Sequence, residues 1–313
     1  MAEKIATREA YGKALVDLGA KYDFVVLDAD LAAATKTGMF KKAFPDRFFD
    51  CGIAEGNMIS VAAGIAATGL VPFASSFAMF AAGRAYEQVR NSVGYPHLNV
   101  KIAATHAGVT VGEDGATHQC NEDIALMRTI PGMTVICPAD GQETAAAVEA
   151  ALLMNGPVYL RLGRAAVPTV TDIPDYKFEI GKAATLHAGT DATVVATGYM
   201  VHIALAAADM LANEGVSVRV LDMHTIKPID GEALLAAARE TGAIVTAEEH
   251  SIIGGLGSAV SEYLSEVCPV PVRRIGVNDC FGRSGTANQM VEYAGLTADK
   301  IAEAVRAAIS LKK

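Results

Sequence analysis

Two stretches in which short apolar segments alternate with amphipathic helical segments limit what this chain can fold into. Parallel strands need long crossover connections, so this alternation is typical of a parallel sheet with helices on both faces. The strands expected in the first stretch are residues 71–75, 100–105, 134–137 and 158–162, and the helices are residues 55–68, 77–93 and 141–154. The last of these helices begins with a capping-box pattern, Asp140 followed by Glu143.

The alternation stops between Gly163 and Lys177, where Pro168 and Pro174 lie among Thr and Asp residues, and then starts again. The strands expected after this break are residues 192–196, 217–222, 243–247 and 272–275, and the helices are residues 200–214, 231–241, 257–265 and 298–311. We therefore expect an α/β protein of two domains, each a mostly parallel sheet with helices on both faces. The predicted units are a first domain over residues 1–165, a linker over 166–181 and a smaller domain over 182–313.

Charge and composition exclude several classes of protein. The chain carries 26 Lys and Arg against 35 Asp and Glu, a net charge of −9, so neither a nucleic-acid partner nor an anionic membrane is expected. A phosphate group would have to be bound by a few placed cations. The five cysteines have no metal-ligand spacing, which indicates core residues in a reducing compartment. No signal-like or membrane-length apolar run is found, and we expect a soluble cytoplasmic protein.

Glu55 lies where an apolar run ending at Cys51 gives way, through a turn, to a helix rich in small residues. A lone acid at such a junction is ordinarily a solvated cap or a favourable partner of the helix dipole. Phe77 and Phe80 follow, three residues apart and therefore on one face of a helix. Viewed alone they are typical of core packing, and the alternative is a flat platform for an aromatic ligand.

A glycine-rich loop, residues 106–119, follows the predicted strand 100–105 and carries His106, Asp114 and His118. Loops at the carboxyl ends of parallel strands line the ligand crevice of an open α/β sheet. Histidine exchanges protons near neutral pH, and a neighbouring carboxylate can orient it. A solvated loop is the alternative, and a metal site from these three residues matches no known ligand spacing.

Glycines at 254, 255 and 257 precede a predicted helix and invite comparison with a dinucleotide-binding turn. That fingerprint needs Gly or Ala at position 260, where this chain has Val260. We interpret the glycines as a structural turn. The preceding Glu248, Glu249 and His250 are expected either to line an interface or to be solvated.

Five short segments carry a family resemblance when they are taken together. They are Gly-Ile-Ala-Glu-Gly at 52–56, Ser-Ser-Phe at 75–77, Gly-Glu-Asp-Gly-Ala-Thr-His-Gln at 112–119, Pro-Ala-Asp at 138–140 and Ala-Glu-Glu-His-Ser-Ile-Ile-Gly-Gly-Leu-Gly at 247–257. In these segments the chain resembles the transketolase family of thiamine-diphosphate enzymes. The resemblance covers essentially the whole chain but only the later part of a full-length transketolase. It implies a pyrimidine-binding domain with the thiamine-diphosphate-binding fold, followed by the transketolase C-terminal domain.

The metal-binding motif of the family is missing. Family members hold a metal ion and the cofactor diphosphate with a Gly-Asp-Gly motif and a later Asn, and this chain contains no Gly-Asp-Gly. The resemblance therefore implies the C-terminal subunit of a split transketolase. An N-terminal partner subunit would hold the diphosphate with magnesium or calcium, and self-dimerisation would give a heterotetramer. The implied reaction transfers a two-carbon ketol group from a ketose phosphate to an aldose phosphate.

The resemblance also implies a role for individual residues. Glu55 occupies the position of the glutamate that hydrogen-bonds the aminopyrimidine ring and activates the cofactor, and Phe77 and Phe80 those that contact this ring. His118 matches a catalytic residue that also meets the donor sugar; the other implied substrate contacts are Asp114 at the sugar and Arg8, His106 and Arg161 at its phosphate. Two positions depart from the family: Gly83 stands where some relatives have a tyrosine, and Ala34, beside Thr35, where the family has a serine near the phosphate.

Other functions remain as alternatives. Deoxyxylulose-phosphate synthase shows a similar Gly-Glu-Asp-Gly-x-Thr-His-Gln loop, and the beta subunit of the 2-oxo-acid dehydrogenases has a similar size and layout. A non-catalytic assembly or regulatory module is the third alternative. Glu55, Asp114 and His118 occurring together favour an enzyme.

Overall fold

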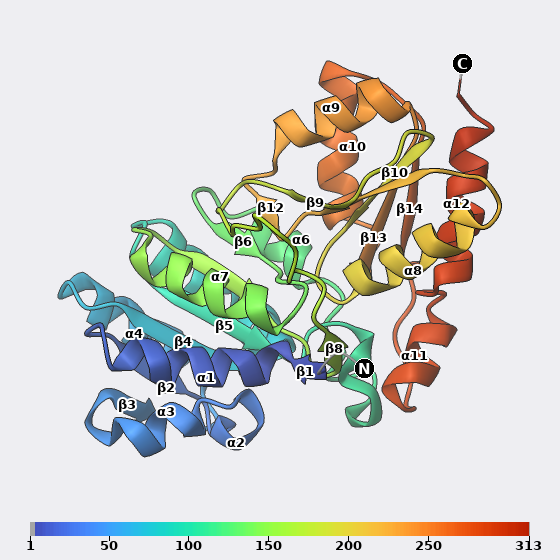
Figure 1. Ribbon diagram of the computed structural model, residues 1–313. Helices are drawn as coiled ribbons and strands as arrows, with labels where there is room; N and C mark the ends of the chain where they lie inside the picture. The colour runs from blue at the N-terminus through green and yellow to red at the C-terminus, as the bar shows by residue number, and fades with distance from the viewer. Residues whose placement is uncertain (1–3, 313) are drawn as a thin grey trace.

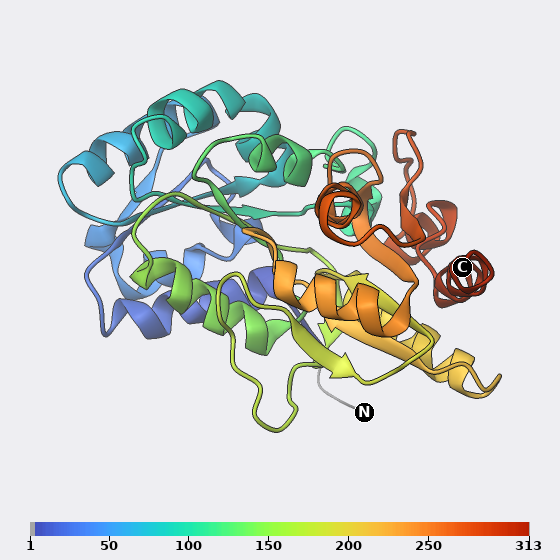
Figure 2. The same ribbon diagram turned by 90° about the horizontal axis from the view of Figure 1, so that it is seen from above.

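Two helix-covered sheets make up the computed structural model, which describes residues 4–312 (Figure 1). The outermost residues of the two predicted domains, 1–3 and 313, lie outside this range. A seven-stranded sheet has the order β12-β6-β7-β5-β4-β2-β3, and a five-stranded sheet has the order β14-β13-β10-β11-β9. Figure 2 shows the blue-to-green half of the chain on one side of the molecule and the orange-to-red half on the other.

All strand pairs are parallel except at three places. In the first sheet β12 runs antiparallel to β6, in the second β9 runs antiparallel to β11, and β1 pairs with β8 antiparallel in a ribbon of their own. The strands are β1 Lys4–Ala6, β2 Val25–Asp28, β3 Phe48–Asp50, β4 Pro72–Phe77, β5 Lys101–Thr105, β6 Thr134–Ile136, β7 Val158–Arg161, β8 Ala166–Pro168, β9 Ala184–His187, β10 Ala192–Ala196, β11 Val218–Asp222, β12 Thr225–Lys227, β13 Ile244–Ser251 and β14 Val272–Val277.

The helices follow the predicted alternation, with several short additions. They are α1 Thr7–Gly19, α2 Ala32–Thr35, α3 Gly38–Ala43, η1 Pro45–Arg47, α4 Glu55–Ala67, η2 Met79–Arg84, α5 Tyr86–Gln88, η3 Val89–Gly94, η4 Val109–Asp114, α6 Asp123–Arg128, α7 Gly141–Leu153, α8 Met200–Ala212, α9 Gly231–Thr241, α10 Leu256–Val267, α11 Ala287–Tyr293 and α12 Ala298–Ile309. Within residues 4–312, no helix combines the length and the apolar character needed to cross a membrane.

Both faces of the seven-stranded sheet are buried. Val25 and Leu27 of β2 belong to a buried cluster that includes Met58 of α4, whereas Val26 belongs to a cluster that includes Leu15 of α1. Successive strand residues point to opposite faces, so a strand covered on both sides must be apolar at every position. This is why the strands of this sheet are mainly apolar on both faces, and the arrangement confirms the predicted α/β fold class.

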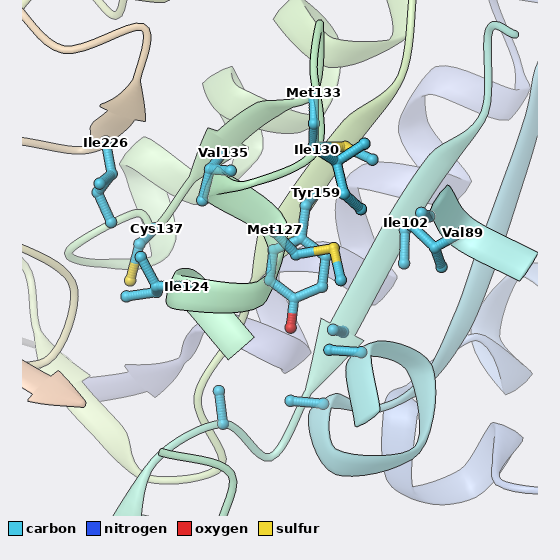
Figure 3. Close-up of a cluster of buried hydrophobic side chains, with 14 of the residues drawn as sticks. Val89, Ile102, Ile124, Met127, Ile130, Met133, Val135, Cys137, Tyr159 and Ile226 are labelled. Atoms are coloured by element: carbon cyan, nitrogen blue, oxygen red, sulfur yellow. The ribbon is translucent and has the colours of Figure 1, made fainter. Parts of the chain in front are cut away.

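The two halves of the chain share one apolar core. Strand β12 crosses into the first sheet, where Thr225 pairs with Ile136 of β6. Its Ile226 belongs to the same buried cluster as Val135 (Figure 3), and that cluster continues to Leu256 of α10. The predicted linker also contributes a strand, because β8 pairs with β1. The linker at residues 166–181 therefore stays a prediction, since strand pairing and apolar packing join the residues before it to those after it.

Buried carboxyl groups mark one contact between the halves. Asp140 caps α7 by accepting a hydrogen bond from the Glu143 amide at 2.9 Å, and it also accepts one from the Thr171 amide at 2.8 Å. The Tyr176 hydroxyl donates to Glu143. Asp222, the last residue of β11, lies beside Glu143, and burial raises the pKa of Glu143 to about 7 and that of Asp222 as well. Both groups therefore hold protons more tightly in the folded chain.

The predicted helix over residues 77–93 is wrong in its start and its type. Strand β4 runs on to Phe77, and the chain then forms the π-helical turns η2 and η3 around the short α5. π-Helical turns are rare and are frequent at functional sites. Arg84, the last residue of η2, is the side chain of these turns that donates a hydrogen bond to Glu55.

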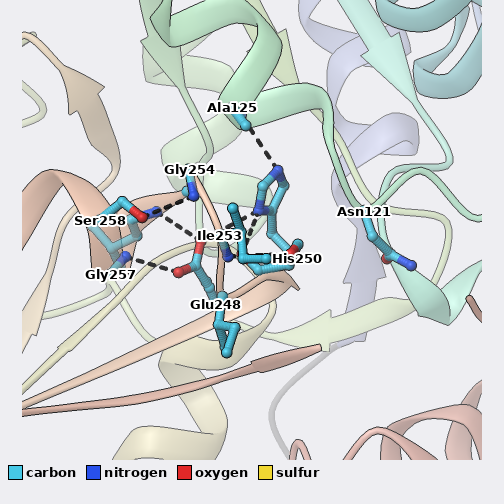
Figure 4. A network of polar contacts seen from close by, with 12 residues as sticks. Asn121, Ala125, Glu248, His250, Ile253, Gly254, Gly257 and Ser258 are labelled. Atoms are coloured by element: carbon cyan, nitrogen blue, oxygen red, sulfur yellow. Dashed lines mark hydrogen bonds and ion pairs between the residues drawn. The ribbon is translucent and has the colours of Figure 1, made fainter. Parts of the chain in front are cut away.

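The glycine turn before α10 is structural. Glu248 of β13 accepts hydrogen bonds from the amides of Leu256 and Gly257 at 2.7 and 2.8 Å (Figure 4). The Ser258 hydroxyl accepts one from the Gly254 amide at 2.8 Å. A carboxylate of the chain itself therefore occupies the positive end of this helix, where a dinucleotide would place its phosphates.

Candidate active site

The predicted residues converge on the carboxyl edge of the seven-stranded sheet. Phe77 ends β4, His106 directly follows β5, Glu55 is the first residue of α4, and Arg8 lies in the first turn of α1. Ligands of open α/β sheets bind at this edge. His118 joins them at the end of the loop that follows β5.

The Glu55 carboxylate is buried and has two partners. Its side chain is 1% exposed, its Oε2 accepts a hydrogen bond from Arg84 Nη1 at 2.8 Å, and its Oε1 lies 3.4 Å from the Ser76 hydroxyl. Arg84 itself is half exposed, and its guanidinium carbon lies 4.4 Å from the centroid of the Phe80 ring. The Glu55 carboxylate therefore lies at the buried end of an aromatic wall, and the half-exposed Arg84 covers the carboxylate from the surface side.

Four rings form that wall. Phe77 and Phe80 lie nearly parallel, with centroids 5.8 Å apart and planes at 12°. His106 stacks on Phe77 at 3.8 Å and 24°, and His118 meets Phe80 edge-on at 5.3 Å and 72°. Offset stacks and edge-on contacts of this kind are favourable ring arrangements. The platform interpretation of Phe77 and Phe80 fits this arrangement, although Phe77 is itself buried.

His106 is a neutral, oriented hydrogen-bonding group. Its Nε2 lies 3.1 Å from Arg8 Nη1, and its Nδ1 lies 2.8 Å from the Thr105 hydroxyl. An arginine cannot accept a hydrogen bond, so Nε2 is the acceptor and the ring proton is on Nδ1. Burial, followed by the positive charge of Arg8, lowers the pKa of His106 to about 3. Its backbone is left-handed, with φ 58°, which is uncommon for a residue other than glycine.

A cluster of positive charge lies beyond the rings. Arg8, Arg164 and Lys36 all lower the pKa of His106, so all three are close to it. Arg8 Nη1 donates to the Ala34 carbonyl at 2.8 Å, and within the described chain its buried Nε has no partner. In a chain with a net charge of −9, these side chains form a local concentration of positive charge.

Arg161 is not part of this cluster. Its side chain is 4% exposed, and its Nε donates to the Asp123 carboxylate at 2.9 Å. Tyr159, two residues earlier on the same strand face, donates to Asp123 at 2.8 Å. Arg161 Nη2 donates to the Glu249 carbonyl at 2.9 Å. The geometry therefore gives no support to the expected phosphate contact of Arg161, and Arg164 is the arginine of this segment that reaches the site.

The remaining predicted residues occupy different surroundings. Asp114 is exposed on the loop; burial and then the charge of Arg164 lower the pKa of Arg8, and Asp114 is close enough to oppose that shift. Thr35 is buried, and its hydroxyl donates to Asp28 Oδ2 at 2.7 Å, so it is committed to the fold. A Cβ at Gly83 would lie 2.1 Å from the methyl group of Met79, so the flexible Met79 side chain would have to move to admit a larger residue there.

The second half of the chain holds the loop in place. Glu249 of β13 accepts a hydrogen bond from the Thr110 amide at 2.6 Å, and Gln119 Nε2 donates to the Arg283 carbonyl at 2.9 Å. Gly108 has φ 79°, and a Cβ there would lie 2.3 Å from Glu249 Oε1. Only glycine allows this carboxylate to approach the loop backbone so closely. Glu249 is buried at a contact inside the chain, so the alternative that it is solvated is wrong.

The sequence analysis missed Arg84 and Arg164. Arg84 is four residues after Phe80, the spacing that brings helical side chains together, and this signal was present in the sequence. Arg164 stands directly after Gly163, at the end of a predicted strand. Its Nη1 donates at 2.6 Å both to the Glu113 carboxylate and to the Val111 carbonyl, within the loop already singled out.

Comparison with known proteins decides the family. Residues 3–169 match the pyrimidine-binding domain of transketolase, and residues 181–301 match the transketolase C-terminal domain. The chain belongs to the transketolase family. This transketolase-family chain is 48% identical to the 6-deoxy-6-sulfo-D-fructose transketolase subunit SqwH of Clostridium sp. (strain MSTE9), covering 95% of this chain and 92% of that protein. It is 42% identical to a subunit of the apulose-4-phosphate transketolase of Phocaeicola vulgatus, covering 95% of each.

A solved structure agrees with the whole fold. A split-gene transketolase, determined as an inactive beta4 tetramer, is 57% identical to this transketolase-family chain and superposes with a TM-score of 0.92 over 99% of this chain and 100% of that one. Human transketolase is 40% identical over 98% of this chain, but the match spans only 50% of the human protein. Transketolases generally use thiamine diphosphate, so the residues needed to bind that cofactor can be compared with the site described above.

Proposed function

We propose that this chain is the C-terminal subunit of a split transketolase. With an N-terminal partner subunit, it transfers a two-carbon ketol group from a ketose phosphate to an aldose phosphate. One observation carries the proposal: a buried carboxylate, a stack of rings and a cluster of cations follow one another along one edge of the sheet. The carboxylate and the phenylalanine rings suit the aminopyrimidine ring, the two histidines suit the reacting sugar carbons, and the cations suit a terminal anion.

The residues fit one part of thiamine diphosphate. Glu55 Oε2 already bonds the planar N–H group of Arg84, and this guanidinium lies over Phe80. An aminopyrimidine presents the same combination of a flat face and N–H donors. When bound, the cofactor supplies a carbon nucleophile for ketol transfer. Glu55 would bind and orient the pyrimidine ring through a hydrogen bond, and Phe77 and Phe80 would exclude water from its face.

The other part of the cofactor has no matching residues here. Among residues 4–312, no group of three or more His, Cys, Asp or Glu side chains is arranged to hold a metal ion. We therefore assign the diphosphate and a magnesium or calcium ion to the partner subunit. The subunit names of two relatives and the inactive beta4 form of the split-gene relative support this division. Self-dimerisation of this chain would make the complete assembly a heterotetramer.

The substrate would lie between the histidines and the cations. We assign proton exchange with the sugar oxygens to His118, because it is half-buried and borders Phe80. Neutral His106 would line the sugar site as a fixed ring, because its two nitrogens already bond Thr105 and Arg8. Arg8 and Arg164 would bind the terminal phosphate, with Asp114 near the sugar hydroxyls. Relatives that act on a sulfonated sugar and on apulose phosphate are compatible with an anion site of this kind, and the physiological sugar is left open.

Co-expression with an N-terminal transketolase subunit tests the proposal. The purified complex is expected to catalyse thiamine-diphosphate-dependent ketol transfer in a coupled assay with phosphorylated and unphosphorylated sugars. The chain purified alone is expected to show none. Activity of the single chain would refute the half-site assignment, and an assembled but inactive complex would refute the enzymatic one.

A further inference from the structure

Arg84 makes two contacts that a ligand of the proposed site would make. Its Nη1 donates to Glu55 Oε2 at 2.8 Å, and its guanidinium carbon lies over the Phe80 ring, 4.4 Å from the centroid. The first contact satisfies a carboxylate that is only 1% exposed. The second contact covers one face of the Phe80 ring. Both groups are the ones assigned to the aminopyrimidine ring.

The resemblance between the two groups is chemical as well as positional. A guanidinium is planar, delocalised and edged with N–H donors, and it stacks on aromatic faces. An aminopyrimidine is also planar and carries N–H donors at its edge. Either group can therefore bond a carboxylate with its edge while its face lies on a phenylalanine. They cannot both do so at the same carboxylate oxygen and on the same ring face.

We propose that Arg84 occupies the aminopyrimidine subsite of the isolated chain and has to leave it before the cofactor ring binds. The inference rests on the proposed function, because it takes Glu55 and Phe80 as cofactor contacts. Arg84 is able to move, since its side chain is 52% exposed and its guanidinium contacts are those to Glu55 and Phe80. Arg84 is the last residue of the π-helical turn η2, and this turn packs against α4.

This contact stabilises the chain and weakens its affinity for the cofactor. Without Arg84, Glu55 would be a buried carboxylate without a cation, which is unfavourable. With Arg84 in place, a ligand must break a charge-assisted hydrogen bond before it forms its own. The apparent affinity is then reduced by the fraction of molecules in which the subsite is closed. A partner subunit that draws Arg84 outward would therefore switch on cofactor binding.

The test measures the binding of 4-amino-5-hydroxymethyl-2-methylpyrimidine, a neutral fragment, to the full isolated chain by NMR titration. Arg84→Ala is expected to bind it about tenfold or more tightly than the unaltered chain, with the gain abolished in Glu55→Gln/Arg84→Ala. Arg84→Lys keeps an ion pair but not a flat group, and should fall between the two. Arg90→Ala removes an exposed charge six residues away and should change nothing. Melting temperatures and amide spectra verify that each variant is folded.

The results separate this inference from the proposed function. Arg84→Ala binding no tighter than the unaltered chain, or a gain that survives loss of the Glu55 carboxylate, would overturn the role of Arg84. If Glu55-dependent activity with the partner subunit is then still found, the proposed function stands. A complex without activity, together with fragment binding that is independent of Glu55, would refute both the role of Arg84 and the proposed function. In the unaltered chain, the Arg84 Nε resonance is expected to shift as the fragment is added, a change that a purely structural arginine would not show.

Discussion

The imidazole of His106 stacks on the ring of Phe77, with ring centroids 3.8 Å apart and planes at 24°. The same imidazole accepts a hydrogen bond from Arg8 at 3.1 Å. An apolar ring on one side and a guanidinium at the edge both disfavour a second proton. The contact therefore holds a histidine in its neutral form at the centre of the proposed site.

Acidification should destabilise the chain through His106. Its pKa is lowered to about 3, from 6.5 in the unfolded chain, so its contribution is fully present above about pH 6.5 and is lost as the pH falls below it. Between about pH 7.5 and pH 5 the loss is about 2 kcal/mol. Urea unfolding of His106→Asn should lack this loss. His97→Asn is the matched control, because His97 is exposed and shares the left-handed backbone. Equal pH dependence in all three chains would contradict the assignment.

Loss of the Glu55 carboxylate should damage catalysis more than assembly. In the complex with the N-terminal subunit, Glu55→Gln is expected to lower turnover by about 10²- to 10⁴-fold, because an amide cannot act as the carboxylate does toward the cofactor ring. Steady-state kinetics and analytical ultracentrifugation measure the two effects. Glu87→Gln, at an exposed position, is the control. A turnover close to that of the unaltered complex would mean that Glu55 is misassigned.

Removal of Arg161 should mainly lower the stability of the chain, whereas removal of Arg164 should mainly weaken substrate binding. Arg161→Ala leaves Asp123 buried without its cation and should lower the free energy of unfolding by about 3–5 kcal/mol. Arg164→Ala should leave stability nearly unchanged but raise KM for phosphorylated sugars about 10- to 100-fold, with little change for unphosphorylated ones.

The matched control for this pair is Arg219→Ala, which removes a cation paired with an exposed glutamate far from the site. It should change stability by about 1 kcal/mol or less and leave KM unaltered. A stable Arg161→Ala chain with a raised KM would restore the role expected from the sequence. An unaltered KM in Arg164→Ala would remove Arg164 from the anion site.

The buried carboxyl groups at the contact between the two halves should make the chain less stable as the pH rises. The pKa of Glu143 is raised to about 7, so its contribution is fully present below about pH 4.5 and is lost as the pH rises toward 7. The pKa of Asp222 is raised as well, first by burial and then by the charge of Glu143, so Asp222→Asn removes one of the two titrating groups and should flatten the dependence measured by thermal unfolding. Asp209→Asn, an exposed aspartate on α8, should leave the slope as it is. A steeper slope in Asp222→Asn would contradict the raised pKa of Asp222.

Much of the fold was predictable because most strands are short, largely apolar segments and the helices between them are long. The predicted helix at residues 231–241 and the strand at 192–196 agree with α9 and β10. Strand β12 was missed because three residues are too few to show a period, and its partner β6 lies about ninety positions away in sequence. Pairing over that distance is decided by packing, which local pattern does not record.

The candidate site was predictable where a motif fixed the position, and less so where geometry decides. Glu55 begins α4, as expected, whereas the contacts of the histidines with Phe77 and Phe80 were not predicted. Arg161 was expected at the phosphate, but it shares a strand face with Tyr159, and both point to Asp123. The period of two along β7 could have indicated this. The direction of Arg164 could not be predicted, because it lies beyond the strand, where Gly163 frees the backbone.

The pairing of β12 with β6 should hold the two halves of the chain together after a single proteolytic cut. A protease cut between residues 172 and 182 would break the backbone, but the fragments would still share a sheet, an apolar cluster and the hydrogen bond from the Thr110 amide to Glu249. A nicked molecule should therefore migrate as one particle and separate only in denaturant. Fragments expressed separately would each expose an unpaired strand edge and half of a core, a combination that favours aggregation.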